Sequence, residues 1–435
     1  MSAPLSVAVV GAGTAGPASA ILLSRAGAQV TLFERVLAPA PVGAGLLLQP
    51  TGMAVLLRLG CLGPVLERGA RVGHLRGVTP SGRTVLDLAY AARRADLFGL
   101  GVHRGSLFAA LWAGLEPAGV TLRTGIEVES LAQDAEGRWR LGMGSAPVHD
   151  GQAFDLVIIA DGARSRLRTA VAPVRRAAPY PFGALWFVGE DSEGRFEGVL
   201  HQVYRSARQM LGLLPSGQAP GSSTRLCSLF WSLPMEGPRG VEAVRAAGLE
   251  TWRSEALALC PAAEPLLAQV HQMDELLTAP YFDVVMRKTH AITCTGRGAV
   301  VLGDAAHAMS PQLGQGANLA LLDAADLVDA LTEAGAIEDP ARVGIGLGGY
   351  GSRRAGPVGT YQFLSRWLTP VFQSDHTLLA TLRDALFGPL CRLPPVRRLM
   401  LDALTGVKTG LLSADEPPLL ALPAVVSPGG PAGPG

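Results

Sequence analysis

Three glycines near the start of the chain have the spacing that binds the pyrophosphate of a dinucleotide. They form the pattern Gly11-x-Gly13-x-x-Gly16, between a short apolar run that predicts a buried strand and a segment that predicts an amphipathic helix. The first glycine permits a tight turn, the second lets the backbone approach phosphate, and the third lets the helix pack on the strand. Thr14 and Ala15 open this helix, whose free N–H groups stabilise phosphate charge.

An acidic residue stands at the end of the second predicted strand. Glu34 lies eighteen residues after Gly16, so the segment has the length of a Rossmann βαβ unit. Its carboxylate can accept hydrogen bonds from ribose hydroxyls and disfavours a 2′-phosphate. The site therefore suits FAD or NAD rather than NADP, and we include the adjacent Arg35 among the expected cofactor contacts.

A second glycine-rich loop lies far along the chain and favours FAD over NAD. An apolar strand ends at Gly303-Asp304, where the carboxyl end of a parallel strand meets a ligand, and a helix begins near Ala317. The positive end of this helix suits the N1–C2=O edge of a reduced flavin, which carries negative charge. The loop and helix residues expected at the flavin ring are Pro311, Gly314, Gly316, Ala317 and Asn318.

These segments, with Asp161-Gly162-Ala-Arg-Ser-Arg166 between them, resemble the three fingerprints of the group A flavoprotein monooxygenases, the para-hydroxybenzoate hydroxylase-like aromatic hydroxylases. The resemblance covers residues 5–330 and implies that Asp304 binds the ribityl chain of FAD. It implies that Arg104 lies near the FAD phosphates or ribityl chain. It also implies that the segment at Asp161 supports FAD and admits the nicotinamide. His307, in the same motif as Asp304, is expected to be structural.

The resemblance further implies an enzyme in which NADH or NADPH reduces FAD transiently. O₂ then forms a flavin C4a-hydroperoxide, which hydroxylates an electron-rich carbon. This chemistry belongs to the cofactor, so we assign no catalytic residue. Baeyer–Villiger or epoxidase chemistry, a reductase or cyclase of the superfamily, and a flavin-loaded binding or sequestering protein remain alternatives. A flavin-dependent halogenase is disfavoured, because no lysine precedes Lys288.

The middle of the chain predicts a sheet that binds the substrate. Residues 180–235 alternate apolar and polar side chains between proline and glycine breaks, which is typical of antiparallel strands. The aromatic content of this segment and the low share of charged residues, 17%, favour a lipophilic aromatic or quinone-like substrate. The side chains expected to contact it are Trp186, Tyr204, Trp231 and Tyr281.

We predict an α/β fold, with a Rossmann-like FAD-binding domain, an inserted, mostly antiparallel substrate-binding sheet and C-terminal helices. The FAD-binding domain is discontinuous and comprises residues 1–75, 100–178 and 285–345. The substrate domain comprises residues 76–99 and 179–284. Residues 346–415 form the helical region, and the Pro/Gly-rich residues 416–435 are expected to be a disordered tail. The pattern Gly344-x-Gly346-x-x-Gly349 follows no predicted strand, so it predicts no second nucleotide site.

Composition excludes several other functions. Lysines and arginines number 37 and acidic residues 36, so the net charge of +1 provides no field for nucleic acid. The five cysteines form no C-x-x-C pair and the eight histidines show no metal-ligand spacing, so we expect no metal. No apolar run reaches the roughly 18 residues of a transmembrane helix, and no signal peptide is recognisable. We expect a cytoplasmic monomer or homodimer, and we leave peripheral membrane contact open.

Overall fold

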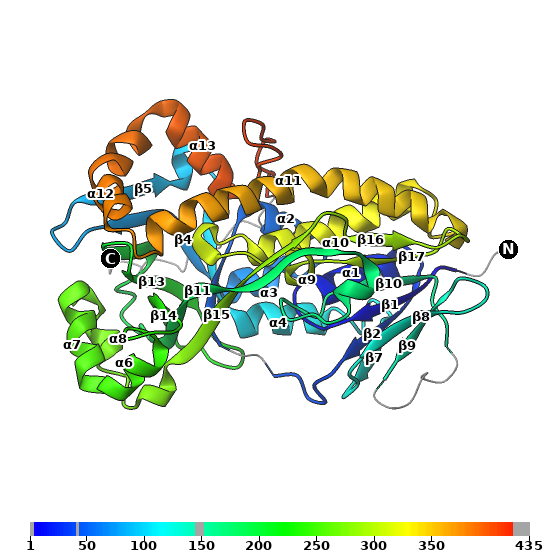
Figure 1. Cartoon of the computed structure of the whole chain (residues 1–435), viewed down its shortest axis with the longest axis horizontal. Coiled ribbons are helices and arrows are strands. Elements are labelled where there is room, and N and C mark those ends of the chain that lie inside the picture. Colours follow the sequence, from blue (N-terminus) through cyan, green and yellow to red (C-terminus); the bar gives the residue numbers. More distant parts are fainter. Residues whose placement is uncertain (1–3, 41–42, 144–151, 421–435) are drawn as a thin grey trace, which may run out of the picture.

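The computed structural model describes residues 4–40, 43–143 and 152–420, and its centre consists of two sheets (Figure 1). One sheet has six strands and the other has nine, and a separate pair of strands lies beside the first. In spatial order the six-stranded sheet comprises β16 His290–Ile292, β17 Gly298–Val301, β10 Leu156–Ile159, β1 Ser6–Val10, β2 Gln29–Glu34 and β7 Thr121–Thr124.

The six-stranded sheet is parallel except at β16 and is covered on both faces. Val7 of β1 pairs with Leu156 on one side and with Val30 on the other, so strands distant in sequence meet at the centre. These strands are short apolar runs, as expected for parallel strands without a solvent-facing side. Helices pack on one face, and the strand pair β8 Ser130–Gln133 and β9 Trp139–Gly142 packs near the other.

The nine-stranded sheet is antiparallel except where β12 pairs with β4. Its strands are β15 Leu277–Met286, β11 Val174–Glu190, β14 Leu226–Pro234, β13 Gln209–Gly217, β12 Gly198–Arg205, β4 Ala70–Val78, β6 Gly99–His103 and β3 Gly45–Leu48, with β5 Thr84–Ala89 beside β4. The structure thus confirms the predicted fold class, including the mostly antiparallel second sheet.

The sheet crosses the domain boundaries expected from the sequence. β4 spans the boundary at residue 75, and β3 lies wholly within a segment assigned to the cofactor domain. The physical reason is the parallel pairing of Leu200 with Leu75, through which the inserted segment extends a sheet already begun by earlier strands. The two domains therefore share a sheet, and their exact limits stay a proposal.

Thirteen helices lie in the described part of the chain, and α11 runs along the upper edge of Figure 1 from the six-stranded sheet to the C-terminal helices. The helices are α1 Ala15–Arg25, α2 Pro50–Arg58, α3 Leu62–Arg68, α4 Arg104–Ala113, α5 Arg168–Val171, α6 Val241–Ala247, α7 Leu249–Leu259, α8 Glu264–Leu267, α9 Asp304–His307, α10 Gly316–Glu333, α11 Val343–Phe372, α12 Thr377–Arg392 and α13 Pro394–Thr405. None of these described helices combines the length and apolarity that crossing a membrane requires.

Arginine side chains contact the end of the described chain, where the tail expected to be disordered begins. Glu416 accepts hydrogen bonds from Arg93 at 3.0 Å and from Arg398 at 3.3 Å. The carbonyls of Pro417 and Pro418 accept from Arg94. Residues 416–418 are therefore held by two arginines that follow β5 and by Arg398 of α13, whereas residues 421–435 of the expected tail lie outside the described residues.

Candidate functional site

The three sequence motifs meet at the carboxyl edge of the six-stranded sheet. A Cβ placed on Gly11 would lie 2.9 Å from the Cα of Asp161, so the first and second motifs are in contact. Gly303 lies between α1 and α10, because its Cβ would lie 3.3 Å from the Cβ of Ala15 and 3.4 Å from that of Ala320. The fold thus brings three distant segments into one site, as the resemblance implies.

The glycine loop has the shape of a phosphate cradle. Gly11 has a φ of +102°, a conformation that favours glycine, and leads directly into the turn before α1. At Gly13 a Cβ would meet nothing within 4 Å, so the backbone here faces open space. The Glu34 carboxylate accepts the N–H of Ala12 at 2.8 Å and the N–H of Val36 at 3.0 Å, which holds the loop beside the end of β2.

Two helices begin at the site without side-chain caps. Neither Thr14 before α1 nor Gln315 before α10 caps its helix by a side-chain hydrogen bond, and neither first turn contains an acidic residue. Their N–H groups and positive dipole ends are therefore available to an anion. FAD offers two such groups, its pyrophosphate and, when reduced, its flavin ring.

Asp161 and Arg168 place buried charge beside the glycine loop. Burial raises the pKa of Asp161, and the electrostatic attraction of Arg168 and Arg35 opposes this shift in part. The Oδ1 atom of Asp161 is buried and has no hydrogen-bond partner among the described residues. Burial lowers the pKa of Arg168, while Asp161 and Asp304 raise it. An unpaired buried carboxylate oxygen calls for a donor, and the hydroxyl groups of FAD would supply one.

The loop before α10 is held against the start of α2 by Asn318. Its side chain is fully buried, its Oδ1 accepts the N–H of Gln49 at 2.8 Å, and its Nδ2 donates to the carbonyl of Gly314 at 3.1 Å. Gly314 is left-handed, with a φ of +61°. Asn318 therefore positions this loop, and a direct contact of its side chain with the flavin ring stays a prediction.

Gln49 is a site residue that the sequence reasoning missed. Its fully buried side chain accepts a hydrogen bond from the Tyr90 hydroxyl at 2.6 Å, while Nε2 has no partner among the described residues. This Nε2 lies 4.0 Å from where a Cβ on Gly314 would be. The sequence feature that could have pointed to Gln49 is its position as a single amide residue between the apolar run of β3 and Pro50 at the start of a helix.

A buried ion network behind the site was also missed. The Asp323 carboxylate accepts the N–H of Gly303 at 2.8 Å, and it lies 2.6 Å from Nε2 of His307 and 2.7 Å from Nε of Arg354. Burial would raise the pKa of Asp323, but His307 and Arg354 lower it to about 2. His307 is thus structural, as expected. The sequence feature that could have pointed to it is Asp323, the first of three aspartates at three-residue spacing in the run that forms α10.

The remaining predicted cofactor residues surround this centre. Asp304 opens α9 and is exposed, and a Cβ on Gly316 would lie 3.8 Å from its Oδ1. Arg35 and Arg104 are exposed, Arg104 as the first residue of α4, and Pro311 is exposed in the loop before α10. The uncapped helices, the open face at Gly13 and the orphaned Asp161 oxygen together fit FAD. No group of three metal-ligating side chains occurs within residues 4–40, 43–143 and 152–420.

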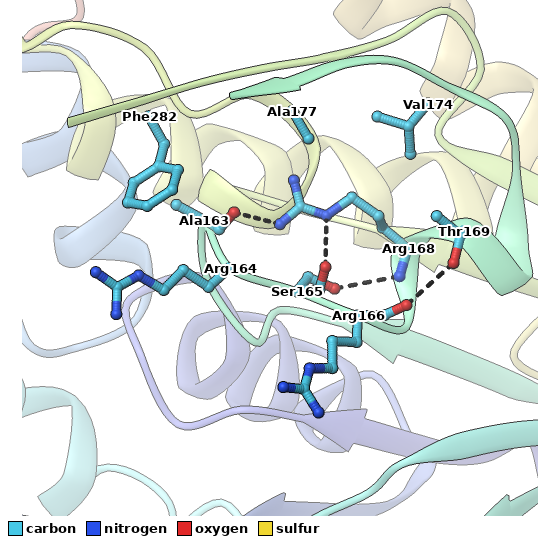
Figure 2. A pocket seen from close by; sticks show the side chains of 9 residues that line it. All are labelled: Ala163, Arg164, Ser165, Arg166, Arg168, Thr169, Val174, Ala177 and Phe282. Atoms are coloured by element: carbon cyan, nitrogen blue, oxygen red, sulfur yellow. Dashed lines mark hydrogen bonds between the residues drawn. The ribbon is translucent and has the colours of Figure 1, made fainter. Parts of the chain in front are cut away.

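An arginine-rich pocket of about 420 Å³ opens beside Asp161 (Figure 2). Arg168 donates to the carbonyl of Ser165 at 3.0 Å and to the carbonyl of Ala163, so it is built into the pocket wall. The exposed side chains of Arg164 and Arg166 point away from Arg168. Neither makes an ion pair with a described residue, and the Arg164 guanidinium lies 5.2 Å from the ring centre of Phe282.

The expected substrate residues divide between the two faces of the nine-stranded sheet. Trp186, Tyr204 and Tyr281 belong to one apolar layer, in which the Trp186 and Phe230 rings lie 5.1 Å apart. Trp231 follows Phe230 on β14, so its side chain points to the opposite face, where it packs on Trp252 of α7 at 6.4 Å. Trp231 therefore lies on the face opposite the other three side chains, and contact of any of the four with substrate stays a prediction.

The chain matches the FAD binding domain family over residues 4–237 and 271–340. The FAD-dependent monooxygenase OpS4 of Beauveria bassiana is 33% identical over 192 residues, covering 42% of this chain and 43% of OpS4. A putative 2-heptyl-3-hydroxy-4(1H)-quinolone synthase, AqdB1 of Rhodococcus erythropolis, is 30% identical over 328 residues, covering 75% of this chain and 79% of that protein.

A solved structure has the same fold along almost the whole chain. The tetrameric form of 2-methyl-3-hydroxypyridine-5-carboxylic acid oxygenase matches with a TM-score of 0.70 at 22% identity. The match covers 94% of this chain and 99% of that chain, so the C-terminal helices are included in the likeness.

Proposed function

Because this chain belongs to the FAD binding domain family and is a FAD-dependent aromatic monooxygenase of group A, we propose that it hydroxylates a neutral, lipophilic aromatic ring, such as an alkylated quinolone. The balanced reaction converts a ring C–H, O₂, NAD(P)H and H⁺ into C–OH, water and NAD(P)⁺. FAD, when bound, supplies the electron transfer from NAD(P)H and the activation of O₂.

The observation that carries the substrate class is the apolar layer on the inner face of the nine-stranded sheet. We call Trp186, Tyr204, Phe230, Tyr281 and Phe372 of this layer the aromatic cluster. Among the described residues, the cation that lies over these rings is Arg383, whose guanidinium is 4.9 Å from the ring centre of Tyr204. Its guanidinium already bonds Asp384 at 2.6 Å and the carbonyl of Ser206 at 3.1 Å, so it is not free for a substrate carboxylate. A neutral ring with an alkyl chain suits such a lining.

The printed name of AqdB1 supports the same class. Its product carries a heptyl chain on a quinolone ring with a 3-hydroxyl group. A ring of this kind is electron-rich and uncharged, and it would stack against aromatic side chains. The monomer or homodimer expected from the sequence belongs to this proposal, although one structural relative is a tetramer.

In this proposal the chain's own residues bind and orient rather than react. Glu34 holds the adenosine ribose, the starts of α1 and α10 hold negative charge, and Asp304 holds the ribityl hydroxyls. Gln49 donates from Nε2 to an acceptor on the ring of the cofactor or the substrate. The aromatic cluster excludes water, which favours transfer of oxygen to the substrate over release of H₂O₂.

The arginine pocket is the place we assign to the reductant. Arg164 and Arg166 present two exposed cations beside Asp161, which suits the pyrophosphate of NADH or NADPH during a transient visit. Supporting this assignment, the side chains of Arg164 and Arg166 extend away from Arg168, which is built into the pocket wall (Figure 2).

Turnover with matched substrates tests the proposed function. FAD-loaded protein should consume NAD(P)H and O₂ faster with the 2-heptyl-4-quinolone that lacks the 3-hydroxyl group, and mass spectrometry should find one added oxygen atom on the ring. A pyridine carboxylic acid serves as the charged comparison. If the carboxylate is hydroxylated and the quinolone is not, the lipophilic substrate class is wrong. Lactone or epoxide products would instead support the Baeyer–Villiger or epoxidase alternatives.

A further inference from the structure

The outward side of α12 is an uncharged surface rich in exposed leucines. Four leucines on it are exposed at four-residue spacing, Leu378 by 70%, Leu382 by 45%, Leu386 by 52% and Leu390 by 44%. The other exposed side chains between them, Thr381, Ala385 and Pro389, are uncharged. At 100° per residue these positions span about half of the helix circumference. We call these seven side chains the α12 outer face.

Unpaired cations lie at one end of the α12 outer face. Arg392 ends α12, and Arg397 lies in α13 just after the connection between the helices; both are exposed, and neither has an ion pair with a described residue. Residues 353–405 contain seven arginines and three aspartates, whereas the whole chain has a net charge of only +1. Five of these seven arginines pair with carboxylates, so Arg392 and Arg397 carry the positive charge that is left unpaired in this segment.

The carboxylates of the same region are already neutralised. Asp375 pairs with Arg208 at 2.7 Å, Asp384 pairs with Arg383 at 2.6 Å, and Asp402 pairs with Arg93 at 2.8 Å. The charge that remains free beside the apolar surface is therefore positive. A complementary partner must be apolar within and negatively charged at its surface.

The opposite side of α12 covers the proposed substrate region. Cys391 is buried and Phe387 partly buried in the apolar layer that contains the aromatic cluster, and Phe387 contacts Phe372 edge-on at 5.7 Å between ring centres. A single helix thus separates the α12 outer face from the aromatic cluster. A surface that supplied a lipophilic substrate would deliver it next to the site.

We propose that the α12 outer face, with Arg392 and Arg397, docks this protein on a membrane surface of anionic phospholipid. Leucines along half of a helix would insert at the level of the acyl chains while the arginines meet phosphate groups. A second copy of the chain fits less well, because the same surface on that copy offers no free carboxylate to Arg392 and Arg397. Docking does not depend on the proposed substrate. A lipophilic substrate would only explain why docking is useful.

Vesicle binding of the FAD-loaded full chain tests the proposal. Without substrate, the protein should co-sediment with vesicles of equal parts phosphatidylcholine and phosphatidylglycerol, and much less with phosphatidylcholine alone. Arg392→Gln/Arg397→Gln should weaken binding about 25-fold, at about fivefold for each arginine near an anionic surface. The matched control Arg239→Gln/Arg287→Gln removes two exposed arginines elsewhere and should bind as the native protein does.

A second pair of variants tests the leucines. Leu382→Glu/Leu386→Glu should abolish binding, while Leu277→Glu/Ile292→Glu, at similar exposures of 46% and 44% in strands β15 and β16, should not. FAD absorbance and the thermal midpoint should be native-like in all four variants, because each altered side chain is exposed. Their turnover on a short-chain, soluble quinolone without vesicles should also be unchanged, which separates failure of docking from failure of the proposed function.

Three results would overturn the proposal. The first is absence of binding to either vesicle, and the second is equal binding to both, which would remove the role of anionic lipid. The third is a lipid-free dimer in sedimentation velocity that Leu382→Glu/Leu386→Glu dissociates, which would assign the α12 outer face to a second copy.

Discussion

The Glu34 carboxylate serves the protein before any ligand arrives, because it accepts the N–H groups of Ala12 and Val36. A bound ribose would use the remaining acceptor positions of the same oxygens. We expect Glu34→Ala to weaken FAD binding by roughly 1.5–3 kcal/mol for each charge-assisted hydrogen bond lost. Turnover at saturating FAD should change little, because the adenosine lies far from the reacting ring.

Titration of the apoprotein with FAD measures this effect, and Glu127→Ala, which changes an exposed acid just after β7, is the control. A collapse of kcat with FAD fully bound would show that Glu34 does not act at the ribose.

Asp323 affects stability in a different way, since it is buried among charged groups. Asp323→Asn leaves Arg354 without its buried partner, and breaking such a pair costs about 3–5 kcal/mol. The native pKa of about 2 is below the ordinary value of 3.8, so the stabilisation is complete above pH 4 and is lost as the pH falls toward 2.

Urea unfolding at several pH values checks both statements. Native protein should lose stability between pH 4 and pH 2, while Asp323→Asn should be less stable at pH 7 and show a smaller loss in that acid range. Asp326→Asn, in which a half-exposed partner of the same arginine is changed, is the control. If Asp323→Asn lost as much stability between pH 4 and pH 2 as the native protein does, the role assigned to Asp323 would be wrong.

At the scale of elements, the loop between β10 and α5 carries the cations that we assign to NAD(P)H. Arg164→Gln/Arg166→Gln should raise the KM for NAD(P)H about tenfold or more, because two charge-assisted contacts to phosphate are lost. FAD content and kcat at saturating NAD(P)H should stay close to native values. Stopped-flow reduction of the bound flavin at varied NAD(P)H measures this directly, with Arg175→Gln as the nearby control.

If flavin reduction in the double variant saturates at the same NAD(P)H concentration as in the native protein, the reductant binds elsewhere. The same measurement with NADH and NADPH would also show which of the two this loop prefers.

The sequence predicted elements best where one local rule governed them. The glycine loop, Asp161 and Asp304 each follow a short apolar strand, so their meeting at one sheet edge follows from parallel topology. Gln49 and Arg168 were not predicted, since each gains its role from partners distant in sequence or from burial that no local pattern reveals. A run of aromatic residues also does not say which face of a strand each side chain takes, so the sequence did not separate Trp231 from the other expected substrate residues.

At the scale of the whole molecule, FAD would join three segments that the chain separates widely. Gly11, Asp161 and Gly303 all border the site, so removal of FAD should loosen contacts among α1, α10 and the sheet. At a free FAD concentration one hundred times Kd, binding stabilises the native state by about 2.7 kcal/mol. We expect the thermal midpoint of the apoprotein to be lower by several degrees and to recover on addition of FAD.

Differential scanning calorimetry of the holoprotein, the apoprotein and the reconstituted protein checks this expectation, with FMN as the control ligand because it lacks the adenosine half. A midpoint that does not respond to FAD would contradict the placement of the site among these segments.

The shared nine-stranded sheet was the feature of overall architecture least accessible to sequence reasoning. The division expected at residue 75 falls inside β4, which continues to Val78 and pairs with a strand that begins at Gly198. Long-range strand pairing depends on the complete topology rather than on any local signal. The C-terminal helices were predicted from their apolar content. The hydrogen bond from Arg93 to Glu416 was not predicted.

The order of strands in the six-stranded sheet also has a consequence for protein synthesis. β1 is made first, but its neighbour β10 ends at Ile159 and the next strand, β17, ends at Val301. At roughly 5–20 residues per second, about fifteen seconds to a minute separate the emergence of β1 from that of α10. During this time the nascent chain carries apolar strands without all of their partners, which exposes them to aggregation, and the chain can capture FAD only near the end of translation.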